Sequence, residues 1–200
     1  RFRNFMDYQR NWLEDSGSDD SHGRALWALG TVLGRSNTPT LHSMAGRLFE
    51  KTLPAILNTT SPRAWAFALI GIHEYVQRFA GDRRASQVRE ELAGRLLTLY
   101  QNSRSDEWRW YEQTLTYCNA ALPHALLLCG QSMSNNAMTE AGLESLRWLV
   151  DLQGAAAAGH HFVPIGSNGF YRRGGTRARF DQQPVEAQAT VSACLEAGRT

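Results

Sequence analysis

Long apolar runs are missing from this sequence. A membrane-spanning helix needs roughly 20 consecutive apolar residues, and no stretch of the 200 residues approaches that length. The opening residues 1–12, RFRNFMDYQRNW, also lack the apolar segment of a signal peptide. We therefore expect no membrane partner.

An excess of one charge is missing too. The chain has 21 Lys and Arg against 19 Asp and Glu, a net charge of +2. Its basic residues are scattered, whereas a nucleic-acid-binding surface needs them gathered in a patch. We expect no nucleic-acid partner. A hydrophobic content of 42% and a charged content of 20% are ordinary for a globular protein and argue against disorder.

Cysteines are few and strand patterns are nearly absent. Cys118, Cys129 and Cys194 show neither a CxxC motif nor the Cys/His spacing of a metal site. The sequence thus predicts no metal and no cofactor. Each Cys lies in a helical pattern among Ala and Leu, which predicts buried, reduced, structural thiols in a cytoplasmic protein. The one weak strand signal is the stretch 160–175, which predicts a long loop with a short hairpin at 167–169.

Four segments share one pattern, in which a polar or Pro-containing entry leads into small and apolar residues and ends at Gly. They begin at His22, Ser61, Asn119 and Pro184, and end at Gly30, Gly71, Gly130 and Gly198. A terminal Gly suits the left-handed position that stops a helix. Pro62 and Pro184 suit a first helical turn, and Ser61 suits an N-cap. Because these segments are apolar nearly all round, they predict helices buried on most sides.

Helices of a second kind are predicted between them, at 39–57, 83–100 and 136–152. In the middle one an apolar stripe recurs at helical spacing, formed by Val88, Leu92, Leu96 and Leu99. Buried and amphipathic helices therefore alternate along the chain. This order predicts an all-α fold with two layers, a helical ring or solenoid whose inner helices line the centre.

The ends of the chain lead to a further expectation. The sequence begins at Arg1 without an initiator Met and stops at Thr200 directly after a helix-like run. We expect residues 1–200 to form a single, partial domain of a longer chain, with the remainder of that chain as its partner.

Four polar loops lead into the predicted inner helices, at 19–24, 61–65, 106–119 and 169–186. Loops that enter at one end of a ring indicate that one face carries the function. Trp and Tyr offer flat apolar platforms, while carboxylates, amides and Arg offer hydrogen bonds. A sugar ring needs both, because it presents a CH face and a rim of hydroxyls. The predicted partner is therefore a carbohydrate, bound by His22, Arg24, Arg63, Trp108, Trp110, Tyr117, Asn119, Tyr171, Arg173, Gln182, Gln183 and Glu186.

Carboxyl groups at the same entries are candidates for catalysis. Glycoside hydrolysis needs two carboxyl groups flanking one bond, one as acid and the other as base or nucleophile. Asp20, Glu112 and Asp181 are the predicted catalytic residues. Glu112 follows Trp110 and Tyr111, a setting that suits the acid.

Each of these residues also has a structural interpretation. Asp20 and Ser21 could cap the first inner helix, Glu112 could lie on the surface of a turn, and Asp181 with Gln183 could brace the loop before Pro184. His22 is better suited to anchoring a loop than to acting as a general base. The rings inside helical runs, Trp27, Trp65 and Trp148, are typical of a core, whereas Trp108 and Trp110 lie in a loop and favour a platform.

Three segments carry a resemblance to a known group. They are DSHGRALWALG from Asp20, WRWYE with LTYCNAALP from Trp108 and Leu115, and FDQQPVEA from Phe180. They resemble bacterial proteins labelled glycosyltransferases or glycosyltransferase-associated, over about residues 15–195. The resemblance implies part of an (α/α)6 toroid, the six-hairpin glycosidase-like architecture. This chain departs from that pattern at Cys118, where an Asp is expected, so any role of that Asp would be lost here.

The leading prediction is a carbohydrate-active domain that binds or processes a sugar or oligosaccharide in the central cavity of the toroid, as a glycosidase-like enzyme or with a glycosyltransferase. One alternative is a sugar 2-epimerase, which needs two opposed imidazoles. Its candidates are His22 and His124. The other alternative is a non-enzymatic helical scaffold, which predicts a large exposed apolar face.

Overall fold

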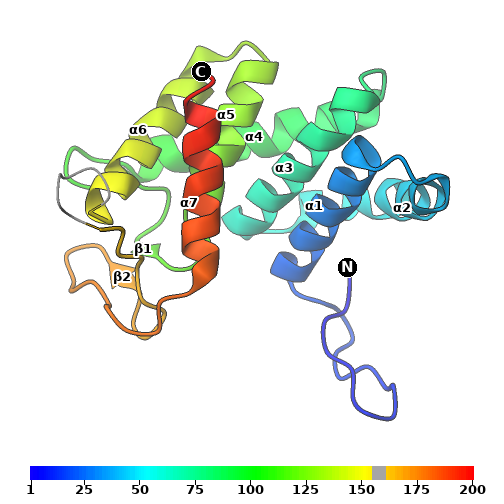
Figure 1. The fold of residues 1–200 in the computed structure, drawn as a ribbon, viewed down its shortest axis with the longest axis horizontal. Helices are drawn as coiled ribbons and strands as arrows, with labels where there is room; N and C mark the ends of the chain where they lie inside the picture. The colour runs from blue at the N-terminus through cyan, green and yellow to red at the C-terminus, as the bar shows by residue number, and fades with distance from the viewer. Residues whose placement is uncertain (155–160) are drawn as a thin grey trace. The chain divides into compact units, whose positions relative to one another are not determined.

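The computed structural model describes residues 1–154 and 161–200; His160, the first residue of the predicted loop stretch, lies outside them. The described chain is mostly helical, which confirms the all-α prediction. Its elements are α1 (Asp19–Arg35), α2 (Pro39–Thr52), the 3-10 helix η1 (Leu53–Asn58), α3 (Pro62–Arg78), α4 (Arg83–Ser103), β1 (Thr114–Leu115), α5 (Ala121–Ser132), α6 (Asn136–Leu152), β2 (Tyr171–Arg172) and α7 (Pro184–Ala197) (Figure 1). None of the described helices is long and apolar enough to cross a membrane.

The chain divides into two compact units, residues 1–94 and 95–200, with the boundary inside α4. The predicted helix 136–152 matches α6 at both ends, and the predicted helix 83–100 matches the start of α4. The predicted helix 39–57 is instead split into α2 and η1. Pro54 lies in the first turn of η1, where its missing N–H and its ring oppose a continuing α-helix.

Helix starts follow local chemistry. Pro62 and Pro184 lie in the first turns of α3 and α7, as predicted, and the Ser61 hydroxyl caps α3 by accepting from the N–H of Ala64. In α1 the N-cap is Ser18, which accepts from the N–H of Ser21. The structural interpretation in which Asp20 and Ser21 cap this helix is therefore wrong.

The prediction that Gly residues stop the inner helices is wrong for three of the four. Gly30, Gly71 and Gly130 lie inside α1, α3 and α5. Each instead sits where another segment passes too closely for a side chain: a Cβ on Gly130 would lie 2.4 Å from the Thr139 hydroxyl oxygen. Gly198 does cap α7, but with a right-handed φ of −71°.

In the first unit, α1 and α3 lie side by side and run in the same direction (Figure 1). Gly23 packs on Ala64, Gly30 on Gly71 and Gly34 on Glu74, so residue numbers rise together along both helices. The helix between them runs the other way. The start of α1 meets the end of α2, where His22 contacts the Thr52 carbonyl, and Gly46 lies against Leu33.

The second unit repeats this arrangement. α5 and α6 are antiparallel, because Gly130 packs on Thr139 while Gly142 packs on Leu127. α5 and α7 are parallel. Asn119 and Glu186 meet just before α5 and in the first turn of α7, and the Gln131 amide donates to the Thr200 hydroxyl at the far ends.

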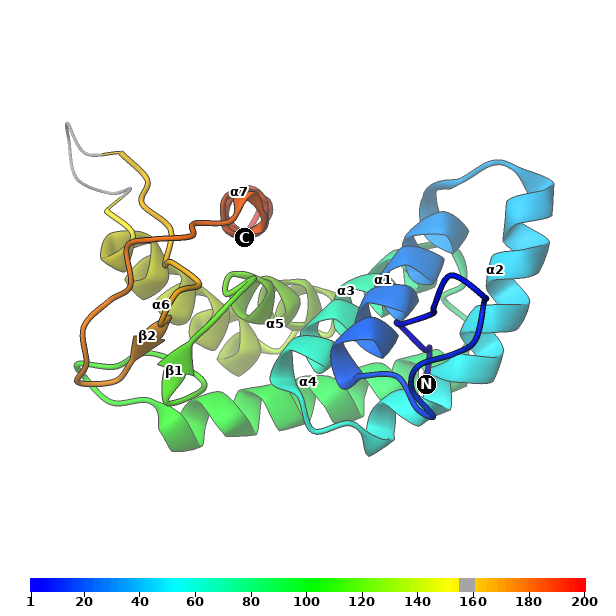
Figure 2. The same cartoon turned by 90° about the horizontal axis from the view of Figure 1, so that it is seen from below.

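A two-stranded antiparallel sheet joins the loops that precede α5 and α7 (Figure 2). Thr114 of β1 pairs with Arg172 of β2, and Leu115 pairs with Tyr171. The predicted hairpin at 167–169 is a turn, and the strand that follows it pairs with a segment far earlier in the chain.

Burial confirms the prediction of inner helices only in part. α3 is buried without a break from Ala66 to Ile72, and α5 is buried along most of its length. α7 differs, since Val191 is 59% and Leu195 is 63% exposed. Cys118 and Cys129 are buried as predicted, whereas Cys194 on α7 is exposed, so the prediction for that thiol is wrong.

Candidate functional site

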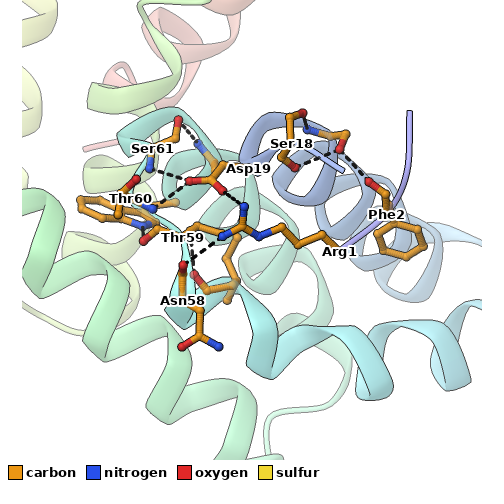
Figure 3. A network of polar contacts seen from close by, with 12 residues as sticks. Arg1, Phe2, Ser18, Asp19, Asn58, Thr59, Thr60 and Ser61 are labelled. Carbon is orange, nitrogen blue, oxygen red and sulfur yellow. Dashed lines mark hydrogen bonds and ion pairs between the residues drawn. The ribbon is translucent and has the colours of Figure 1, made fainter. Parts of the chain in front are cut away.

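A carboxylate ties together the entries of the two parallel helices in the first unit. Asp19, in the first turn of α1, accepts from the N–H of Thr60 at 2.8 Å and of Ser61 at 3.1 Å, just before α3 (Figure 3). Arg1 forms an ion pair with the same carboxylate at 2.7 Å. Asp19 therefore satisfies N–H groups that precede α3 and fixes how the two helices start side by side.

The predicted catalytic residue Asp20 lies beside Asp19 but has different partners. Its carboxylate accepts from the Arg24 guanidinium at 2.7 Å, one helical turn along α1. The Arg24 guanidinium lies 4.3 Å from the centre of the Phe67 ring. Two predicted site residues are thus brought together, and their pairing leaves both side chains partly exposed.

His22 is closed off from solvent. Its side chain is 0% exposed, its Nε2 lies 3.1 Å from the Thr52 carbonyl oxygen, and the Phe2 ring lies beside it. Burial lowers the pKa of the imidazole below its ordinary value. The contact with the Thr52 carbonyl joins the first turn of α1 to the end of α2, which supports the interpretation of His22 as an anchor.

The residues at the start of α3 are also mostly buried or bonded within the protein. Arg63 is 4% exposed in the first turn of α3. The Trp65 indole donates to the Thr59 carbonyl at 3.1 Å. Trp27 of α1 stacks on Phe67 of α3 with ring centres 5.7 Å apart, so these rings hold the two helices together.

The second unit has a matching carboxylate. Glu186, 2% exposed in the first turn of α7, accepts from the N–H groups of Cys118 and Asn119 and, at 2.9 Å, from the Asn119 amide. Asn119 also accepts from the N–H of Thr116. The predicted residues Asn119 and Glu186 therefore meet, and most of their hydrogen-bonding capacity is used within the protein.

Cys118 takes an uncommon backbone conformation at this contact. Its φ is +48°, in the left-handed region, and its N–H donates to Glu186. Conformations of this kind cost free energy and persist where the surroundings enforce them. The bend aims two successive N–H groups at one carboxylate, so the backbone at Cys118 has a structural task whatever its side chain.

The interpretation of Trp108 and Trp110 as open platforms does not fit their burial. Trp108 is 3% and Trp110 is 0% exposed. Both pack on Trp148 of α6, with ring centres 5.1 and 6.0 Å away. The Trp108 indole donates to the Glu112 carbonyl at 2.8 Å. The loop folds over α6 and uses these rings as core, a choice that loop position alone does not reveal.

Predicted site residues that are more exposed lie on the joined loops, the two loops that β1 and β2 hold together. Tyr171 is half-buried with its ring edge against Trp108, and Arg173 donates to the Ser105 hydroxyl at 2.7 Å. Tyr117 and Glu112 are half-buried. Exposed side chains complete the group, namely Asp181, Gln182 and Gln183. The Gln182 amide donates to the Arg179 carbonyl at 3.0 Å.

The catalytic candidate Asp181 is held in place through its backbone. Asp181 has a left-handed φ of +58°, and its carbonyl accepts from the N–H and the hydroxyl of Ser167. This supports its structural interpretation as a brace of the loop. Gln183 is the N-cap residue of α7, without a side-chain cap bond. The catalytic roles of Asp20, Glu112 and Asp181 stay predictions.

A cavity of about 710 Å³ opens beside these loops in the second unit. Among the predicted site residues only Gln182 lines it; the sequence reasoning missed Gln153, Arg177 and Arg179 as members of a site. A signal existed, because no Asp or Glu occurs between Asp151 and Asp181 while Arg occurs four times. Among the described residues, no group of three or more His, Cys, Asp or Glu is placed to hold a metal ion.

No protein-family model, curated protein or solved structure matches this chain. The arrangement of the helices and the chemistry of the entry loops are therefore the grounds on which a function is proposed.

Proposed function

We propose that this chain is part of a carbohydrate-active (α/α)6 toroid domain. It binds a sugar or oligosaccharide at the helix entries, as a glycosidase-like enzyme or as the sugar-binding partner of a glycosyltransferase. The remainder of a longer chain would complete the ring.

The observation that carries the proposal is a repeated helix arrangement. In each unit two parallel helices, α1 with α3 and α5 with α7, start at the same end, and an antiparallel helix connects or flanks them. In each unit one acidic side chain, Asp19 or Glu186, binds N–H groups at the neighbouring entry. Parallel inner helices with antiparallel outer ones are what a toroid of helical hairpins requires.

Side-chain chemistry at the entries supports a sugar as ligand. On the joined loops of the second unit, Tyr171 offers an aromatic ring, and Arg173, Gln182 and Gln183 offer hydrogen-bonding groups that solvent reaches. Such groups can pair with hydroxyls while a ring covers a CH face. The carboxyl of Glu112 is half-buried in the same unit, and we propose it as the acid of a glycosidase.

A screen of neutral oligosaccharides for binding and hydrolysis tests this proposal. If hydrolysis is found, Glu112→Gln should lower kcat by at least a hundredfold, because general acid catalysis contributes about 10²–10⁴. Glu107→Gln is the matched control, since Glu107 is an exposed carboxylate of the same loop. Unchanged kcat in Glu112→Gln would remove this residue from the mechanism, and a screen without any bound glycan would defeat the proposal.

The exposed face of α7 favours a second candidate, a helical interaction scaffold. Val191 and Leu195 are exposed beside an apolar groove of about 430 Å³ that Val150 and Phe162 also line. Soluble proteins rarely expose large contiguous apolar patches without a use. A double change of Val191 and Leu195 to Ser would weaken self-association in sedimentation experiments if copies of the chain meet there, and would leave glycan binding unchanged.

A further inference from the structure

The cavity of the second unit has an unusual balance of charge. Arg177 and Arg179 both line it, and its described lining contains no Asp or Glu. The sequence around it has the same bias, because the residues from Leu152 to Phe180 include four Arg and no acid. The positive charge of this surface thus has no carboxylate to balance it among the described lining residues.

Arg177 is fixed in place by the backbone. Its two terminal nitrogens donate to the carbonyls of Leu152 and Val163. No ion pair joins its guanidinium to a carboxylate among the described residues, and its Nε–H is buried without an acceptor there. Burial and the neighbouring charge of Arg179 lower the pKa of Arg177, although an Arg stays protonated in proteins.

A second buried donor lacks a partner at the same place. Gln153 is 0% exposed and lines the cavity, and its amide nitrogen finds no acceptor among the described residues. Its amide oxygen is already engaged by the Thr190 hydroxyl. Buried donors are nearly always satisfied in folded proteins, and each exception needs an explanation such as a bound ion.

We propose that this cavity is an oxyanion-binding site, which takes the phosphate or carboxylate group of a small molecule. Two guanidinium groups supply charge-assisted hydrogen bonds, and the Gln153 amide supplies a further N–H donor in the cavity wall. Arg179 is the exposed arm that reaches the anion, and Arg177 is the fixed one. The cavity shares Gln182 with the loops proposed to bind a neutral sugar, but the inference rests on the two guanidinium groups and on Gln153 and does not depend on sugar binding.

Inorganic phosphate is the first probe, observed by the broadening of its ³¹P resonance on titration with the protein. Arg179→Gln is the test variant, because Arg179 is exposed and its loss should leave the fold intact. Arg172→Gln is the matched control, an exposed Arg of the same segment that does not line the cavity. Arg179→Gln should weaken phosphate binding roughly tenfold, the usual worth of a hydrogen bond between charged groups, and Arg172→Gln should bind as the unaltered protein does.

Competition separates the sources of the anion. Glucuronate should displace phosphate if a carboxylate enters the site, and failure of glucuronate together with success of glucose 1-phosphate would assign the site to phosphate groups. Equal binding by both Arg variants or no broadening at all would overturn the proposal, and neither result depends on the neutral-glycan screen.

Discussion

Gly30 of α1 and Gly71 of α3 lie backbone against backbone: a Cβ placed on Gly30 would stand 2.0 Å from the Gly71 carbonyl oxygen. The reverse contact is also too close for a side chain, since a Cβ on Gly71 would stand 2.4 Å from the Leu26 carbonyl oxygen. No side chain fits at that distance, so the two parallel helices would have to separate.

Gly30→Ala and Gly71→Ala should therefore each lower the free energy of unfolding by about 1–3 kcal/mol or more, as overpacked cores do. Chemical denaturation followed by circular dichroism measures this. Gly94→Ala is the control, because Gly94 lies within α4 and a Cβ there meets nothing within 4 Å. It should stabilise the protein by roughly 0.5–1 kcal/mol through helix propensity alone, and equal effects at Gly30 and Gly94 would contradict the close approach.

Glu186→Gln should destabilise the second unit. The variant keeps the shape but replaces one carboxylate oxygen by a donor, which then faces the N–H groups of Cys118 and Asn119. Leaving such buried groups unpaired costs about 1–3 kcal/mol. Thermal unfolding of this variant should be compared with that of Glu140→Gln, an exposed carboxylate on α6. A melting temperature unchanged in both would show that the contact contributes little.

Acid should weaken the protein through His22. Its pKa is lower in the folded chain than the ordinary 6.5, so the unfolded chain takes up the proton first as pH falls. The contribution of the neutral ring to stability is complete above about pH 6.5 and is lost progressively below it, at about 1.4 kcal/mol for each unit of pKa lowering. His22→Gln should flatten the dependence of the melting temperature on pH between 7 and 5, and a dependence as steep as that of the unaltered protein would contradict this role of the buried ring.

Thiol labelling should divide the three cysteines. Cys194 is exposed, while Cys118 and Cys129 are buried. A thiol reagent should therefore modify Cys194 alone in the native protein, and all three after unfolding. At pH 8 Cys194 should react with the reagent more slowly than a free small-molecule thiol does. Partial burial raises the pKa of Cys194 and so lowers its thiolate fraction. Native-state labelling of Cys129 would contradict the packing of α5.

The periodicity of apolar residues predicted most of the secondary structure. The stripe through Val88, Leu92 and Leu96 predicted α4, and the entry chemistry of Ser61 and Pro62 fixed the start of α3. Such signals are local, since a cap or a first-turn Pro acts within one turn of its own helix. The site was predicted less well. Asn119 and Glu186 were predicted to bind a sugar and do lie in contact, but each serves as a hydrogen-bonding partner of the other.

What the sequence by itself determined is the helical class, the order of the helices and the polar character of their entries, because spacing and turn chemistry are properties of short segments. Tertiary structure alone decided the use of Gly30 and Gly71, since a glycine that stops a helix and one that admits a neighbouring backbone look the same in sequence. It also buried Trp110 and placed Arg177 and Gln153 around one cavity. Contacts between distant residues depend on how whole helices pack, and no local pattern records them.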